Sequence, residues 1–114
     1  MQIKIVDDSG ATAKVVLTGK LDIAGAEVVA LPLATLAGGK RGVLIDMTGV
    51  TFIASIGIRH LVSASKALMR RGGRLVLLNP NPMVADVLTT SGVTELMTLA
   101  HSEADAAAAL KPQA

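Results

Sequence analysis

The stretch that decides the fold is VLIDMTGVTFIASIGIRHL, residues 43–61. Its first three residues are apolar and precede Asp46, a pattern that predicts a short buried strand. We expect a loop over residues 47–54, with the turn pair Thr48-Gly49, and then a helix that begins at Ser55. A strand that leads into a helix N-terminus often forms a site in α/β proteins. Unpaired N–H groups at such a terminus favour negative charge, so Ser55 is the first candidate residue.

The sequence on both sides alternates between strand-like and helix-like segments. Strands are expected at residues 2–6, 15–17, 43–47, 74–79 and 95–100, and helices at residues 24–37, 55–71, 82–91 and 103–110. The first two strands are expected to form a hairpin, followed by a loop over residues 19–22. Pro32 predicts either a kink in the first helix or the start of a second one. This order of elements predicts one α/β domain, residues 1–114.

Three helices carry informative positions. Residues 58, 61, 62, 65 and 68 have the spacing of an inward stripe, and Arg59, Ser63, Lys66 and Arg70 recur on the outward side. Asn81 is placed to cap the third helix, with Pro82 in its first turn, and its expected apolar face is Met83, Val87 and Leu88. Ser102 and Asp105 have the spacing of a capping box, and Pro112 is expected to end the last helix.

The composition narrows the function classes. The chain has 114 residues, of which 51% are hydrophobic, and its one aromatic residue, Phe52, argues against a nucleic-acid binder that stacks bases. With no cysteine and only His60 and His101, no metal or cofactor site is expected, and His60 is expected to be a surface or boundary residue. No catalytic spacing or phosphate-binding glycine loop is present, so we do not expect an enzyme. The N-terminus lacks a leader pattern and no apolar stretch could span a bilayer, which predicts a cytoplasmic protein without direct membrane insertion.

Four segments, taken in order, resemble the STAS domain family, the anti-sigma-factor antagonists. Residues 43–61 are similar to the central motif of that family, in which a strand ending in Asp, a Ser/Thr-Gly-Val turn and an aromatic precede Asp-Ser-Ser/Thr-Gly-Leu. Residues 18–22 resemble its Gly-Glu-Leu-Asp segment, residues 72–75 its helix-to-strand turn, and residues 82–92 its third helix. The resemblance implies an α/β fold with a mixed β-sheet of about five strands and four to five helices mainly on one side.

The resemblance also implies a regulatory switch. In the family, a partner kinase phosphorylates the first hydroxyl residue after the motif Asp, and the unphosphorylated protein binds an anti-sigma factor. If this pattern applies to the present sequence, Ser55 is the candidate phosphoacceptor. Asp22 and Asp46 match acidic positions around the same loop. A phosphatase is a further expected partner. The partner-binding residues expected on this basis are Asp22, Asp46, Thr51, Ala54, Ser55, Ile56, Gly57, Arg59, Ser63 and Lys66.

The motif departs from the family pattern on both sides of the candidate acceptor. Ala54 stands where the family has Asp, Ile56 stands where Ser or Thr is usual, and Lys20 replaces a common Glu. These changes favour an alternative function, a STAS interaction module of a larger assembly that is not phosphorylated, such as a transporter, a lipid-transport system or a sensory complex.

Each candidate residue also has a purely structural interpretation. Ser55 would then be a plain N-cap, and Asp22 and Asp46 would organise their loops by binding backbone N–H groups. The stripe of Arg59, Lys66 and Arg70 either docks an acidic partner or is an ordinary solvated helix face.

Overall fold

A five-stranded mixed sheet forms the centre of the molecule. The computed structural model describes residues 1–8 and 10–110. The strands are β1 (Gln2–Asp7), β2 (Thr12–Leu21), β3 (Gly42–Ile53), β4 (Arg74–Leu78) and β5 (Thr98–Ala100), and they lie in the order β1-β2-β3-β4-β5. The β1–β2 pair is antiparallel, which confirms the predicted hairpin, and the other three pairs are parallel.

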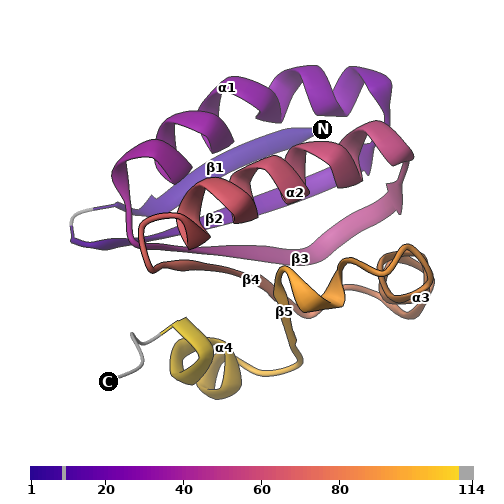
Figure 1. The fold of residues 1–114 in the computed structure, drawn as a ribbon. Helices are drawn as coiled ribbons and strands as arrows, with labels where there is room; N and C mark the ends of the chain where they lie inside the picture. The colour runs from indigo at the N-terminus through magenta and orange to yellow at the C-terminus, as the bar shows by residue number, and fades with distance from the viewer. Residues whose placement is uncertain (9, 111–114) are drawn as a thin grey trace.

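Among the described residues, three α-helices pack on one face of this sheet and one α-helix packs on the other. The helical segments are α1 (Ile23–Gly39), α2 (Ser55–Met69), α3 (Pro82–Thr90), the short 3-10 helix η1 (Val93–Glu95) and α4 (Glu103–Leu110). Figure 1 shows α1 and α2 side by side on one face and α4 on the opposite face. The predicted order of elements, and the predicted sheet of about five strands with helices mainly on one side, are confirmed.

The apolar run at the start of β3 packs on both faces, as the sequence predicts. Val43, Ile45 and Met47 are buried in the larger core beneath α1 and α2. Leu44 points the other way and joins the smaller core beneath α4. Successive side chains of a strand point to opposite faces of the sheet. A strand therefore needs apolar residues at successive positions only where both faces of the sheet are covered.

Two segments that the sequence predicts as loops are strand. β3 continues through residues 47–53, and β2 continues through residues 19–21. The two extensions pair with each other in parallel, down to Leu21 opposite Ile53, with two register shifts on the way. The backbone hydrogen bonds of this pair therefore outweigh the turn propensity of Thr48-Gly49 and of Gly19. As a result, the helix N-termini that follow lie at the same edge of the sheet.

Pro32 neither breaks nor divides α1, which runs through it as one helix. A proline inside a helix costs one backbone hydrogen bond. Here the flanking residues Val29 and Leu33 are fully buried against the sheet, and their burial offsets that cost. The alternative of a second helix starting at Pro32 is therefore wrong.

The later elements follow their capping signals closely. The Asn81 side chain accepts a hydrogen bond from the Val84 N–H at 2.8 Å, and the Ser102 hydroxyl accepts one from the Asp105 N–H at 3.1 Å, so both predicted caps are confirmed. The predicted apolar face of α3 is wrong at Met83, because Val84 and Leu88 are the residues it buries while Met83 is exposed. The predicted stop at Pro112 lies outside the described residues.

The last predicted strand is shorter than expected. Glu95 belongs to η1 instead, and residues 96 and 97 form the turn that follows, in which the Leu96 N–H donates to the Val93 carbonyl at 2.9 Å. The buried Ser65 hydroxyl of α2 donates to the Leu96 carbonyl, which fixes this turn against the helix. Leu96 thus has both backbone groups occupied outside the sheet, and β5 begins only at Thr98. No helix in residues 1–8 or 10–110 is long and apolar enough to cross a membrane.

Candidate functional site

Ser55 is the first residue of α2 and is exposed to solvent. The N-cap is Ala54, whose backbone is extended (φ −104°, ψ 168°) and whose carbonyl accepts from the Ile58 N–H at 3.1 Å. The interpretation of Ser55 as an N-cap is therefore wrong by one residue. Ala54 has no side-chain oxygen to offer, and the first turn of α2 contains no acidic residue. The positive end of this helix is left without a compensating negative charge.

Close packing against the end of β2 fixes the position of this helix start. The Ala54 N–H donates to the Leu21 carbonyl at 2.9 Å. A Cβ built on Gly57 would lie 2.6 Å from the Leu21 Cγ and 2.9 Å from the Leu21 carbonyl oxygen. Gly57 is buried, so its part in the site is to let α2 approach the strand rather than to contact a partner.

Asp22 directly follows Leu21 and lies next to this contact. Its carboxylate accepts from the Gly25 N–H at 2.9 Å and so caps α1. The structural interpretation of Asp22 is confirmed by this bond, and its partial exposure leaves a partner contact as a prediction. The N-termini of α1 and α2 therefore lie beside each other, one with an acidic cap and one without.

Asp46 does not belong to this group, and the expectation that it surrounds the same loop is wrong. It lies seven residues before Ile53 in β3, which is roughly 23 Å along an extended strand. One carboxylate oxygen accepts from the Thr48 N–H at 3.0 Å and from the Thr48 hydroxyl at 2.6 Å. Asp46 lines a hollow with His101 and Glu103 beside the start of α4, on the opposite face from α1 and α2. The sequence does not reveal the position of Asp46, because the sequence pattern predicts that the strand ends there, whereas β3 continues to Ile53.

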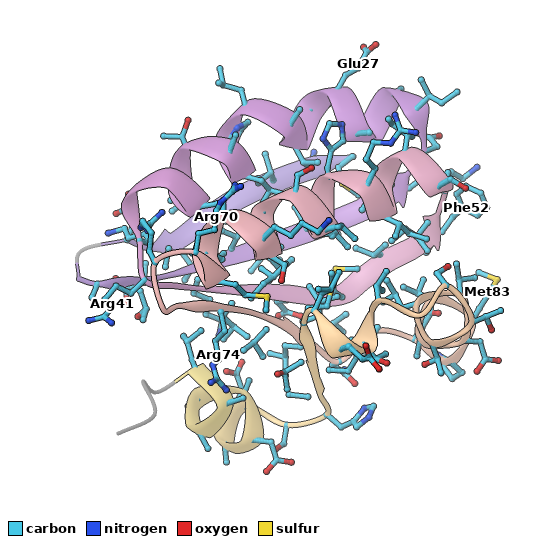
Figure 2. All side chains as sticks on the ribbon, viewed as in Figure 1. Glu27, Arg41, Phe52, Arg70, Arg74 and Met83 are labelled. Carbon is cyan, nitrogen blue, oxygen red and sulfur yellow. The ribbon has the colours of Figure 1, made fainter. Side chains whose placement is uncertain are left out.

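Exposed apolar side chains gather at the end of the sheet where Ser55 lies. Phe52, the only aromatic residue of the chain, is 44% exposed, and Met83 at the start of α3 is 53% exposed. Figure 2 shows both at the same end of the molecule. Ile23 is exposed at the start of α1, and Ile56 is half-buried next to Ser55. Of these four residues, only Ile56 is expected from the sequence to contact a partner. Phe52, the aromatic residue three positions before α2, is the signal that could have identified this surface.

The remaining predicted contact residues lie on the outward surface. Thr51, Arg59, Ser63 and Lys66 are all exposed, as the helical spacing predicts for the last three. His60 is half-buried at the boundary between α1 and α2. Within the described ranges, no group of three or more His, Cys, Asp or Glu side chains is arranged to hold a metal ion. The chemistry on offer near Ser55 is an exposed hydroxyl, a positive helix end and an apolar surround.

The sequence and the fold are both similar to those of known proteins. The sequence profile of the STAS domain matches residues 2–106. The chain belongs to the STAS domain family. It is 34% identical over 96 residues to BtrV of Bordetella bronchiseptica, a proposed anti-sigma factor antagonist, and the match covers 83% of each chain.

Solved STAS structures share this fold. The unphosphorylated form of the anti-sigma factor antagonist SpoIIAA superposes with a TM-score of 0.79 at 24% identity, covering 93% of each chain. A structure of the Bacillus SpoIIAA in its phosphorylated form is also similar, with a TM-score of 0.74 at 22% identity and coverage of 96% and 100%. The murine anion transporter Slc26a9 is similar over 90% of this chain but only 18% of its own, with a TM-score of 0.72 at 22% identity. These structures show the shared fold, and the family match together with the similarity to BtrV makes this chain an anti-sigma-factor-antagonist-like STAS protein.

Proposed function

We propose that this STAS protein is a regulatory switch that binds an anti-sigma factor or its serine kinase through the surface around Ser55. Phosphorylation of Ser55 releases the partner, and a phosphatase reverses the change. The observation that carries the proposal is the position of Ser55 as an exposed hydroxyl at the first residue of α2. The similarity to BtrV over 83% of both chains supports the same class of partner.

The electrostatics around Ser55 support a switch of this kind. A phosphoryl group adds about −1.5 to −2 charge at neutral pH. At the start of α2 this charge meets unpaired N–H groups and no acidic residue in the first turn, and the nearby Asp22 carboxylate is already bonded to the Gly25 N–H, so the fold tolerates it. The same charge would stand among Phe52, Ile56 and Ile23, whose apolar surface a partner must cover. Burying an unpaired charge there costs a few kcal/mol, which is enough to weaken binding without any change of fold.

The test is phosphorylation by the cognate kinase, followed by intact-mass measurement. The wild-type chain should gain one phosphate, and Ser55→Ala should gain none. Ser63→Ala is a matched control, because Ser63 is also exposed on the outward side of α2, and it should be labelled like the wild type. Full labelling of Ser55→Ala would show that the acceptor is another residue.

A second function is supported by the residues that flank Ser55. Ala54 removes the family's carboxylate, and Ile56 replaces a polar neighbour with an apolar one. Both changes favour a constitutive interaction module within a larger assembly, as in the STAS-like part of Slc26a9. Such a module should co-purify with a partner whose affinity does not change in Ser55→Asp. A large drop in affinity with Ser55→Asp would instead favour the switch.

A further inference from the structure

A groove runs between α1 and α2 on the outer surface of the molecule. It is lined by Ala30, Ala34 and Gly38 of α1 and by His60, Ser63 and Ala67 of α2. Its volume is about 150 Å³. A cavity of about this size can hold a benzene-sized apolar group. The groove therefore has room for one large aliphatic or aromatic side chain from another molecule.

The α1 side of this groove is apolar, although it faces solvent. Its lining residues on α1 are three alanines, Leu33 and Gly38, and Leu31, beside Ala30 in the chain, is 75% exposed. Glu27 is the only charged residue of the helix. A helix that is hydrophobic all round is ordinarily covered on all sides. The sheet and α2 cover only the inner side of α1, so its outer side is the part left for a partner.

Basic side chains flank the groove on its α2 side, at helical spacing from the lining residue Ser63. Arg59, Lys66 and Arg70 are exposed and lie at helical spacing along the outward side of α2. The only ion pair found within residues 1–8 and 10–110 joins Lys14 and Glu103, so these three cations have no carboxylate partner there. Arg71 closes the far end of the groove, where its guanidinium donates to the Ala37 carbonyl in the last turn of α1.

We propose that this groove binds an amphipathic helix of a partner protein, with an acidic flank turned toward α2. The apolar face of that helix would contact Leu31 and Ala34, one large side chain would enter the hollow, and carboxylates on one flank would pair with Lys66 and Arg70. The match rests on charge complementarity, because the two sides of the groove differ: one is apolar and the other is cationic. Recognition of an amphipathic helix in a hydrophobic groove is a common mode of binding.

The same asymmetry argues against other occupants. A second copy of this chain would offer these cations no acidic flank, since α2 has no acidic residue and Glu27 is the only acid on α1. An anionic membrane or a nucleic acid would bind best to a surface with cations on both sides of the groove. The α1 side has no cation, so the groove does not fit either of them. Figure 2 shows Glu27 on the α1 side and Arg70 on the α2 side of the molecule. This proposal does not depend on phosphorylation of Ser55.

The test uses synthetic helical peptides with one tryptophan in their apolar face. The protein contains no Trp and no Tyr, so indole fluorescence reports on the peptide alone. One peptide carries glutamates along one flank, and its control carries lysines at the same positions. We expect the acidic peptide to bind at least tenfold more tightly than the basic one, with a blue-shifted emission and an affinity that falls as salt is added.

Three changes in the protein should weaken binding of the acidic peptide by at least tenfold. Leu31→Ser removes the exposed apolar contact, Ala34→Leu fills the hollow, and the pair Lys66→Glu and Arg70→Glu reverses the cationic side. The pair Lys4→Glu and Lys20→Glu is the control, because it makes the same charge change on exposed strand positions of β1 and β2. It should leave binding within twofold of the wild type, as should Ser55→Asp, which separates this proposal from the switch.

Several results would overturn the proposal. Equal binding of the acidic and basic peptides would show that charge on the α2 side does not select the partner. Wild-type affinity in Leu31→Ser and Ala34→Leu would place the peptide elsewhere. Binding of anionic vesicles that competes with the acidic peptide, or self-association that Leu31→Ser abolishes, would assign the surface to one of the rejected occupants.

Discussion

The two ends of the mixed sheet contact the termini of their helices in opposite ways. At the amino end, a cationic side chain donates to a helix carbonyl: Arg71 donates to Ala37 in the last turn of α1. At the carboxyl end, α1 has an acidic cap in Asp22, whereas α2 has no polar cap at all. Helix dipoles explain the difference, since carbonyls at C-termini attract cations and N–H groups at N-termini attract anions. The contrast teaches that, of these two neighbouring helix starts, that of α2 is the one left able to receive a negative charge.

The amino end is also where a small substitution should do most damage. A Cβ built on Gly73 would lie 1.5 Å from the Arg41 carbonyl oxygen, and the neighbouring Arg74 N–H donates to that same oxygen at 3.1 Å. Because both contacts are backbone, neither side can move without breaking the β3–β4 pairing. We expect Gly73→Ala to lower the free energy of unfolding by more than about 3 kcal/mol in urea denaturation.

Gly38→Ala is the control for this substitution. It replaces a helical glycine with no atom within 4 Å of the added Cβ, and it should raise the free energy of unfolding by about 0.5 kcal/mol. A loss of stability in Gly38→Ala as large as that in Gly73→Ala would show that close packing is not the cause.

The carboxyl end should tolerate a comparable change better. In Gly57→Ala the added methyl group meets the Leu21 Cγ at 2.6 Å, and that side chain can shift, although the Leu21 carbonyl oxygen at 2.9 Å is less free. We expect a loss of about 1 to 3 kcal/mol of unfolding free energy. Partner binding should weaken as well, because the start of α2 must move away from β2. Unchanged stability in urea would mean that α2 is not packed as tightly as the geometry indicates.

Restoring the family's carboxylate should stabilise the uncapped helix. Ala54 already has the extended backbone of an N-cap, so the Asp side chain in Ala54→Asp can accept a hydrogen bond from the first turn of α2. We expect a gain of about 1 kcal/mol in the free energy of unfolding, measured by urea denaturation. The gain should shrink at a pH low enough to protonate the new carboxylate. A loss of stability would contradict the assignment of Ala54 as the N-cap.

Changes at Ser55 itself should have the smallest effect on stability. Because Ser55 is not the cap, Ser55→Ala should change the free energy of unfolding by less than about 0.5 kcal/mol. Ser55→Asp should stabilise the fold by about 0.3 to 1 kcal/mol, since it brings a negative charge to the helix start. A loss of about 1 kcal/mol in Ser55→Ala, as expected for a lost cap, would contradict this geometry.

The sequence predicts the order of the elements because α2 and α3 have apolar stripes at helical spacing and the buried strands are continuous apolar runs. It fails where pairing between distant segments decides the structure, as in the extension of β3 beyond Met47 and of β2 through Leu21. That error also places Asp46 beside Ser55, although strand length separates them. The start of α2 at Ser55 is predicted correctly, but the N-cap is Ala54 and not Ser55, because backbone dihedrals are not visible in the sequence.

The most direct test of the switch is the affinity of the natural partner for three forms of the protein. The partner is first identified by pull-down, and its dissociation constant is then measured with wild-type protein, Ser55→Ala and Ser55→Asp. We expect Ser55→Ala to bind within about threefold of the wild type and Ser55→Asp to bind at least about 30-fold more weakly, about 2 kcal/mol, while both remain folded. Equal affinity of all three forms would contradict the central claim that a negative charge at the start of α2 controls partner binding.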